Sequence, residues 1–244
     1  MSILNPSILE KLRQFDTPTI CNIIEVFEIR PQSAGFMDDR IKCCFPEMPP
    51  MVGFASTATF RSSAPPRSGD VYSDLTAQIA RFDELSGPAV IVFQDLDNPP
   101  VGATFGEVMT SCYQAFGSVG LITSGAGRDL DQVRALGYPV FTSGTICSHG
   151  YPHIPNIHVP VHVGGIMIYP NDLLHGDCNG VTTIPIEIVT EVVEVGYEFV
   201  AAEQVVLDVV RGKHPDFKLV VEARAESRRQ IEKLRARVSR KKKS

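Results

Sequence analysis

The sequence predicts an α/β fold built around a parallel β-sheet, and three observations support this prediction. The segment Ala89–Gln94 (AVIVFQ) is almost entirely apolar, as expected for a strand that is buried on both faces. Strand-like and helix-like segments alternate between residues 89 and 142, which is typical of βαβ units. Hydrophobic residues make up 43% of the 244 residues, so the chain can bury a large core.

Residue spacing and turn residues predict the remaining elements of the first part of the chain. Residues 8–27 are expected to form two short helices divided at Thr17-Pro18, with Asp16 or Thr17 as the cap of the second helix. Residues 30–50 are rich in turn formers and should lie on the surface. The expected order then continues as strand 52–61, loop 64–69, helix 72–85, strand 89–94, helix 106–116, strand 119–123, helix 129–136 and strand 139–142.

The strand–helix alternation ends after residue 142. Strands are expected at 158–168 and 180–184, around the turn-rich sequence HGDCNG, whose tight turn is built on Asn179-Gly180. Helical spacing covers about residues 185–211, and a charged helix is expected at about 220–238. Because no linker divides the earlier residues, we interpret residues 1–212 as one domain and residues 213–244 as a basic helical tail.

Charge is distributed unevenly along the chain. Residues 222–244 hold 10 Lys and Arg and 3 acidic residues, whereas the other 221 residues hold 13 basic and 25 acidic residues. An acidic body argues against nucleic-acid binding. We interpret the basic tail as a solvated helix, with contact to an anionic partner as the alternative.

Features of membrane and secreted proteins are absent from the sequence. No apolar run approaches the roughly 20 residues that a membrane helix needs, and the N-terminus has no secretory-signal pattern. The six cysteines form no CxxC pair. We therefore expect a cytoplasmic protein with reduced thiols and no membrane contact.

The first candidate site is the sequence GATFGEVM at residues 102–109, which opens a helix after a predicted strand. Backbone amides of Glu107, Val108 and Met109 at the helix N-terminus suit a carboxylate or phosphate, and Gly106 allows a ligand to approach closely. The GxGxxG dinucleotide fingerprint and the GK[ST] of a phosphate-binding loop are both absent. The alternative is an ordinary strand-to-helix turn.

The second candidate site is SGAGRDLDQ at residues 124–132, where another buried strand runs into a helix. Ligands of open α/β sheets bind at such carboxyl ends. Arg128 offers a planar fork for a carboxylate or enolate oxygen, and Asp129 can coordinate a hard cation such as Mg²⁺. The alternative is structural: Asp129 caps the helix, and Arg128 pairs with a surface acid.

The third candidate is a series of four histidines, for which a metal site is the less favoured interpretation. Pro152, Pro155 and Pro160 forbid the long helix on which their spacing would suit a metal. A polar wall of a site or a subunit contact is favoured, and the third and fourth histidines, four residues apart, would share a face if they lay in one strand. The series consists of His149, His153, His158 and His162.

Taken in order, the segments GATFGE, VGLITSGAGRD, PVFTSG and PVHVGGIMIYPNDLLHGDCNGVTTIP resemble the RraA-like family, over roughly residues 15–212. This family includes class II pyruvate aldolases, which cleave 4-hydroxy-4-methyl-2-oxoglutarate or 4-carboxy-4-hydroxy-2-oxoadipate, and regulators of ribonuclease E. The resemblance implies a swivelling β/β/α-type domain with N- and C-terminal helical extensions. It also implies a homo-oligomer, either a trimer or a hexamer.

The resemblance also implies roles for particular residues. Asp129 matches the metal-binding aspartate of the family, with Mg²⁺ or Mn²⁺ as the cofactor, and Arg128 matches the arginine that contacts the keto or enolate oxygen. The turn Gly106–Met109 matches the segment that holds the pyruvyl carboxylate. Glu203 matches a glutamate that reaches the site of a neighbouring subunit in the aldolases. The sequence departs from the aldolases at Asn22, Gln132 and Asn171.

These observations lead to two functional hypotheses. The favoured one is a metal-dependent lyase, acting by retro-aldol cleavage or by decarboxylation of a substrate such as oxaloacetate, in which Arg128, Asp129 and Glu203 are catalytic. A metal ion and a cation such as Arg128 would stabilise the pyruvate enolate that both reactions leave. The alternative is a non-enzymatic, protein-binding regulator of RNA degradation, which would act without metal.

Overall fold

The computed structural model describes residues 5–241, which group into two compact units. The first unit contains the described residues up to Thr17 together with Gly35–Ile186. The second contains Pro18–Ala34 and the described residues from Glu187 onward. The boundary that the sequence suggested at residue 212 falls inside this second unit, directly after the helix α6 (Val189–Val210).

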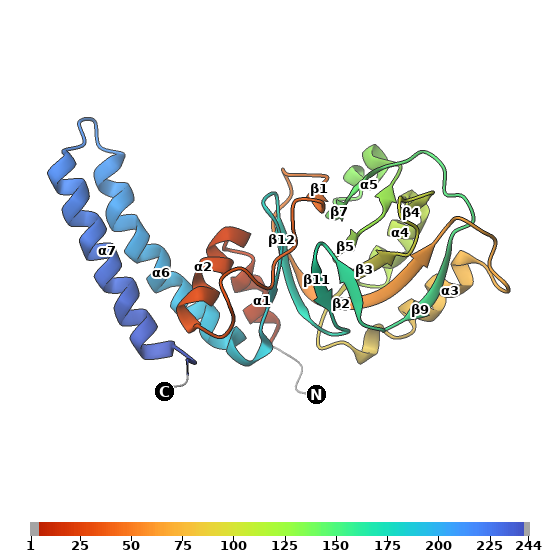
Figure 1. The fold of residues 1–244 in the computed structure, drawn as a ribbon, viewed down its shortest axis with the longest axis horizontal. Coiled ribbons are helices and arrows are strands. Elements are labelled where there is room, and N and C mark those ends of the chain that lie inside the picture. The colour runs from red at the N-terminus through yellow and green to blue at the C-terminus, as the bar shows by residue number, and fades with distance from the viewer. Residues whose placement is uncertain (1–4, 242–244) are drawn as a thin grey trace. The chain divides into compact units, whose positions relative to one another are not determined.

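The first unit is built on an eight-stranded mixed sheet (Figure 1). Its strands are β1 (Lys42–Cys43), β2 (Met51–Arg61), β3 (Ala89–Asp95), β5 (Gly120–Thr123), β7 (Val140–Thr142), β9 (His153–Ile157), β12 (Leu173–Asp177) and β13 (Gly180–Ile184). They are ordered β1-β7-β5-β3-β2-β12-β13, and β9 also pairs with β2. The central strands β7, β5, β3 and β2 are parallel, as predicted, and the strands around them are antiparallel.

Within the described residues, two small sheets, four α-helices and the short 3-10 helix Phe82–Glu84 complete the first unit. A three-stranded parallel sheet contains β4 (Ala103–Phe105), β6 (Ala126–Gly127) and β8 (Gly144–Thr145), and a hairpin contains β10 (Val161–Val163) and β11 (Ile166–Ile168). The helices are α1 (Pro6–Leu12), α3 (Val71–Ile79), α4 (Glu107–Ala115) and α5 (Leu130–Ala135). Strand β4 leads directly into α4, and β6 leads into α5, which is the arrangement that forms the candidate site.

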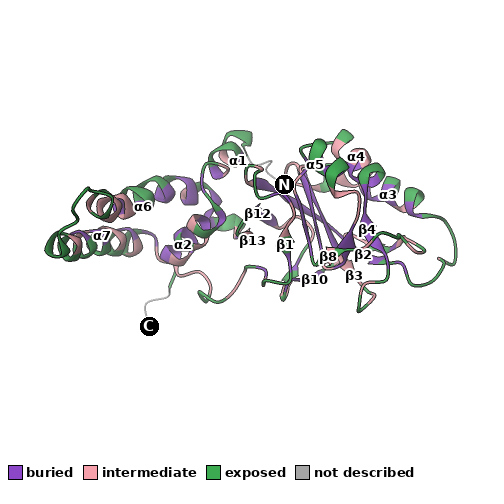
Figure 2. Ribbon diagram, turned by 90° about the horizontal axis from the view of Figure 1, so that it is seen from above, coloured by how far each residue is buried: buried purple, intermediate pink, exposed green. Residues whose placement is uncertain are grey.

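The core of the first unit lies on both faces of β3 (Figure 2). Ile91 and Phe93 belong to one cluster of buried residues, and Val90 and Val92 belong to a second cluster. On the first face, the ring of Phe93 lies 5.3 Å from that of Phe60. Because successive side chains of a strand point to opposite faces, the nearly all-apolar sequence of β3 follows from its burial on both sides.

Two expectations for the second half of the first unit are wrong. Residues 158–168 do not form one strand, because His158 has a φ of 54° and the chain reverses at Gly164-Gly165, where both φ values are positive. His158 and His162 therefore do not share a strand face. The expected turn around HGDCNG is also shorter, since β12 continues to Asp177, which pairs with Gly180.

The second unit consists mainly of α2 (Thr17–Phe27), whose first residue belongs to the other unit, and a hairpin of α6 and α7 (Phe217–Val238). The basic tail forms a helix as expected, but one of its faces packs against α6. Arg237 pairs with Glu198 at 2.5 Å, and Arg240 pairs with Glu191. Acidic side chains of α6 thus partly neutralise the basic charge of α7. Within residues 5–241, no helix is long and apolar enough to cross a membrane.

Candidate active site

Two strand-to-helix turns come together at the candidate site. Strands β4 and β6 are parallel neighbours, and Phe105 pairs with Gly127. The residues that follow each strand therefore lie next to each other: Gly106 at the start of α4, and Arg128 and Asp129 at the start of α5. The structure brings together the two Gly-containing motifs that the sequence singled out separately.

The carboxylate of Asp129 points towards α4 rather than towards its own helix. Asp129 occupies the N-cap position of α5 in the left-handed conformation, with a φ of 55°, and within the described chain its side chain makes no capping bond. Its Oδ2 instead accepts a hydrogen bond of 3.1 Å from the backbone amide of Glu107. This geometry contradicts the structural alternative, in which Asp129 caps α5. Backbone strain at an accessible carboxylate is a feature of functional sites.

Gly106 leaves the space that the carboxylate of Asp129 needs. A Cβ atom at Gly106 would lie 2.6 Å from Oδ2 of Asp129 and 3.2 Å from Nε of Arg128. The backbone of Gly106 is extended, with φ at −160°, so this position needs glycine for space and not for its conformation. The glycine thus allows close approach of the two motifs, whereas its expected role of admitting a ligand stays a prediction.

Arg128 lies beside the same carboxylate. Its Nε is 3.8 Å from Oδ2 of Asp129, and its backbone amide donates to the carbonyl of Phe105 at 3.2 Å. The side chains of Arg128 and Asp129 are 35% and 38% exposed, so both charged groups can be reached by a ligand. Arg128 therefore pairs with a partly exposed acid, as the structural alternative expected, and this acid is the neighbouring Asp129.

The helix N-terminus of α4 differs from expectation in one detail. The sequence suggested that the amides of Glu107, Val108 and Met109 are all available to an anionic ligand. The amide of Glu107 already donates to Asp129, which leaves those of Val108 and Met109, in the first turn, without acceptors inside the helix. The side chain of Met109 is buried in the core and that of Val108 is exposed, so the first turn of α4 packs against the core through Met109.

The site suits a hard divalent cation that keeps most of its water ligands. In the described part of the chain, no group of three or more His, Cys, Asp or Glu side chains is placed to hold a metal ion. Zinc would need such a set. Magnesium instead binds through one or two carboxylates, with waters and substrate oxygens completing its octahedron. The half-exposed Asp129 carboxylate fits this second pattern.

Comparison with known proteins identifies the family. Residues 17–183 match the RraA-like family, described as Aldolase/RraA. The chain belongs to this family. The matched segment contains the residues of both turns, including Gly106, Arg128 and Asp129.

Individual members of the RraA-like family are similar over parts of the chain. A protein of Halalkalibacterium halodurans named "Putative 4-hydroxy-4-methyl-2-oxoglutarate aldolase" is 34% identical over 119 residues, which are 45% of this chain and 57% of that protein. The chain thus matches little more than half the length of this relative.

Solved structures share the fold. A protein of unknown function from Pseudomonas syringae pv. tomato has a TM-score of 0.71 at 22% identity, covering 92% of this chain and 95% of that chain. The Streptomyces coelicolor protein RraAS2, described as an unusual member of the RNase ES inhibitor RraA protein family, has a TM-score of 0.66 at 21% identity, covering 84% and 97%. These similarities confirm the α/β fold of the RraA-like family with its helical extensions.

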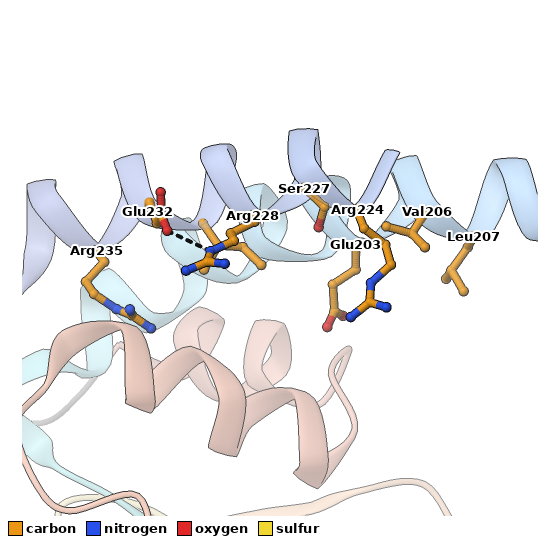
Figure 3. Close-up of a pocket in the computed structure, with 9 residues that line it drawn as sticks. Glu203, Val206, Leu207, Arg224, Ser227, Arg228, Glu232 and Arg235 are labelled. Carbon is orange, nitrogen blue, oxygen red and sulfur yellow. Dashed lines mark hydrogen bonds and ion pairs between the residues drawn. The ribbon is translucent and has the colours of Figure 1, made fainter. Parts of the chain in front are cut away.

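Glu203, for which the family resemblance predicts a role at the active site, lies on α6 in the second unit. It lines a groove of about 560 Å³ between α6 and α7, and in Figure 3 its carboxylate lies next to Arg224. Its expected role at the site of a neighbouring subunit stays a prediction.

The histidine series does not form a metal site in the described residues. The side chain of His158 is almost fully buried, and the ring lies 3.3 Å from the hydroxyl of Ser56 and 3.2 Å from the carboxylate of Glu84. Burial lowers the pKa of this imidazole. His158 therefore has a structural position at the corner between β9 and β10.

Asp95, a partly buried acid, was not among the candidate residues predicted from the sequence. Asp95 ends β3, and its Oδ2 is buried against Gly125 with no hydrogen-bond partner in the described chain. Burial raises the pKa of this carboxyl to about 6. A cavity of about 690 Å³ lies beside Asp95 and Ser124, at the carboxyl ends of β3 and β5. The signal was present in the sequence, because an acid directly follows a nearly all-apolar strand.

Proposed function

We propose that this member of the RraA-like family is a divalent-metal-dependent lyase that acts on a pyruvate-type 2-oxo acid. The reaction is either retro-aldol cleavage or decarboxylation, and both proceed through a pyruvate enolate. One observation carries the proposal: the Asp129 carboxylate, the Arg128 guanidinium and the N-terminal amides of α4 meet around Gly106.

The chain's own groups can bind and orient the substrate. The amides of Val108 and Met109 lie at the positive end of the α4 dipole and are suited to bind the two oxygens of the substrate's carboxylate. Arg128 is suited to the neighbouring keto oxygen, because its guanidinium donates hydrogen bonds in a fixed plane. The amide of Glu107 holds Asp129 in place through its 3.1 Å bond.

A bound divalent cation would supply positive charge against the keto and enolate oxygens, with Asp129 as its protein ligand. In the aldol reaction, the C4 hydroxyl would pass its proton to a hydrogen-bonded water as the C3–C4 bond breaks, so that C4 becomes a carbonyl carbon and the bonding electron pair moves into the enolate. In decarboxylation, the electron pair comes from the bond between C3 and the carboxylate carbon, which leaves as carbon dioxide. Arg128 stabilises the enolate oxygen in both, and protonation of C3 then gives pyruvate.

The experiment is a measurement of pyruvate release from oxaloacetate and from 4-hydroxy-4-methyl-2-oxoglutarate, with Mg²⁺, with Mn²⁺ and with a chelator. Reactions without protein are needed, because free metal ions promote decarboxylation of oxaloacetate by themselves. The proposal expects protein-dependent pyruvate that disappears with the chelator. Absence of such pyruvate from both compounds with either metal would count against it.

The regulator hypothesis remains the competing proposal. The fold does not distinguish the two functions, since the RraA-like family contains aldolases and ribonuclease inhibitors. Adding the purified protein to ribonuclease E separates them. A metal-independent decrease in the rate of RNA cleavage would favour the regulator, and an unchanged rate would favour the enzyme.

A further inference from the structure

A second cavity in the first unit lies at the end of β2. Its volume is about 540 Å³, within the range of small-molecule sites. The cavity is formed by the last residue of β2, the loop that follows it and the beginning of β9. None of the residues Gly106–Met109, Arg128 or Asp129 lines it.

Two basic side chains face each other across the strands that form this cavity. Arg61 of β2 and His153 of β9 are direct partners in the antiparallel register, so their side chains leave the same face of the sheet. The register shifts between Thr59 and Arg61, and such an irregularity redirects the side chain that follows it. Both side chains line the cavity.

The imidazole of His153 keeps one nitrogen for a ligand. Its Nδ1 lies 2.9 Å from the carbonyl oxygen of Tyr151, so Nδ1–H donates to that oxygen. Nε2 is then the nitrogen that is left to accept a hydrogen bond. Arg61 has an acidic neighbour outside the lining, because its Nε lies 3.6 Å from Oδ1 of Asp97.

A third basic group comes from the loop after β2. Arg67 follows Pro65-Pro66, whose fixed φ angles stiffen the loop. Within residues 5–241, no hydrogen bond or ion pair engages Arg67. The acid that lines the cavity is Asp74, and its Oδ2 accepts the amide of Ile154 at 3.0 Å. Two arginines of the lining thus face one acid, and Arg67 is the one that pairs with no acid within residues 5–241, since Arg61 pairs with Asp97.

The remaining walls are mostly apolar. Apart from Ser68, the other residues that line the cavity have apolar side chains: Ala64, Pro65, Pro66, Leu96, Ile154 and Pro155. A small inorganic anion would use the basic groups and leave these walls in contact with water. A ligand with an apolar body would cover them, which is favourable by the area removed from water.

We propose that this cavity binds an organic carboxylate with a compact apolar body. Arg67 and the terminal nitrogens of Arg61, whose Nε faces Asp97, would hold the carboxylate, and the prolines would contact the body. Because the cavity shares no residue with the candidate active site, this proposal stands whether or not the protein releases pyruvate.

Phenylacetate binding to the full chain tests the proposal, measured by titration calorimetry and by chemical-shift changes in ¹⁵N-labelled protein. The variant Arg67→Gln removes one cation from an exposed loop and should weaken binding at least fivefold. The matched control Lys11→Gln removes the same charge from the exposed face of α1 and should leave the affinity unchanged. Equal affinities of wild type and Arg67→Gln would overturn the proposal.

Two further probes test the two halves of the site. Phenylacetamide keeps the ring without the charge, and inorganic phosphate keeps the charge without the ring. Both should bind at least tenfold more weakly than phenylacetate, and equal binding of either one contradicts the proposal. The Asp129→Asn variant should bind phenylacetate as wild type does. Loss of binding in that variant would place the ligand in the candidate active site instead.

Discussion

At the scale of single residues, the site depends on where one carboxylate points. The sequence of Arg128-Asp129 was compatible with a helix cap or with a cation ligand. The structure argues against a cap of α5, because Oδ2 of Asp129 accepts the amide of Glu107 across the β4–β6 pair, and the cation-binding role stays a prediction. The identity of both residues could be read from the sequence, but the rotation of the side chain could not, since it depends on pairing between segments 22 residues apart.

Gly106→Ala tests the steric part of this geometry. The extended backbone accepts alanine, but the new Cβ would lie 2.6 Å from Oδ2 of Asp129, so the carboxylate must move. We expect kcat/KM for pyruvate release to fall by about tenfold or more, because small displacements at a reacting centre are costly. Thermal unfolding should change little. Gly144→Ala is the control, since nothing lies within 4 Å of its added Cβ. A Gly106→Ala enzyme with wild-type kcat/KM would contradict the steric argument.

At the scale of elements, long apolar segments were predicted well and short pairings were missed. The strands β2, β3 and β5 lie where their apolar residues indicated. The strands β6 and β8 have only two residues each, which is too short for an alternation of apolar and polar residues to predict them. These two strands nevertheless form the small sheet that aligns both motifs. The separation of the chain into two units was also missed, because it arises from packing between distant segments.

Strand β12 is tied to the N-terminal residues through a buried histidine. Nδ1 of His175 lies 3.0 Å from the hydroxyl of Thr17, and Nε2 lies 3.2 Å from the carbonyl of Leu12. Burial lowers the pKa of His175, so the folded state favours the neutral ring. Stability is therefore full above the ordinary pKa of about 6.5 and is lost as the pH falls below it.

The variant His175→Gln should weaken this pH dependence. We expect the melting temperature of the wild type to fall between pH 7.5 and 5.5, and that of the variant to fall less over the same range. The control is His162→Gln at an exposed position. The measurement is thermal unfolding followed by circular dichroism at each pH. Parallel curves for wild type and His175→Gln would show that this imidazole is not the group responsible.

The hairpin of α6 and α7 should depend on its apolar contacts more than on its ion pairs. Arg237 and Glu198 are about half exposed, and such pairs contribute roughly 0–1 kcal/mol. Leu234 is buried, and its replacement by alanine typically costs about 2–5 kcal/mol. We expect urea unfolding to show a small loss for Arg237→Gln and a larger one for Leu234→Ala. The reverse order would mean that charge pairing holds the hairpin together.

At the scale of the whole molecule, the open question is whether the active site is shared between subunits. The family resemblance suggests that Glu203 completes the site of a neighbouring subunit. Mixtures of Asp129→Asn and Glu203→Gln subunits test this directly. If each is inactive alone, random mixing in a closed ring gives about a quarter of the sites with both native residues.

We therefore expect the mixture, after subunit exchange, to reach about a quarter of the wild-type rate per site. Each variant alone should show no activity. The experiment needs the oligomeric state of the mixture, measured by light scattering, and a control mixture of each variant with itself. If a fully exchanged oligomer recovers no activity, then either Glu203 and Asp129 of the same subunit act in one site, or Glu203 is not part of the site.

The central claim is that Asp129 binds the divalent cation that makes pyruvate release possible. The most direct measurement compares metal-stimulated pyruvate release by the wild type, Asp129→Asn and the control Asp131→Asn, whose side chain is 92% exposed on the same helix. Asparagine tolerates the left-handed backbone and can still accept the Glu107 amide, but it lacks the charge. We predict at least a hundredfold lower metal-dependent rate for Asp129→Asn, with an unchanged melting temperature and a normal rate for Asp131→Asn. A metal-dependent rate for Asp129→Asn equal to that of the wild type would contradict the account.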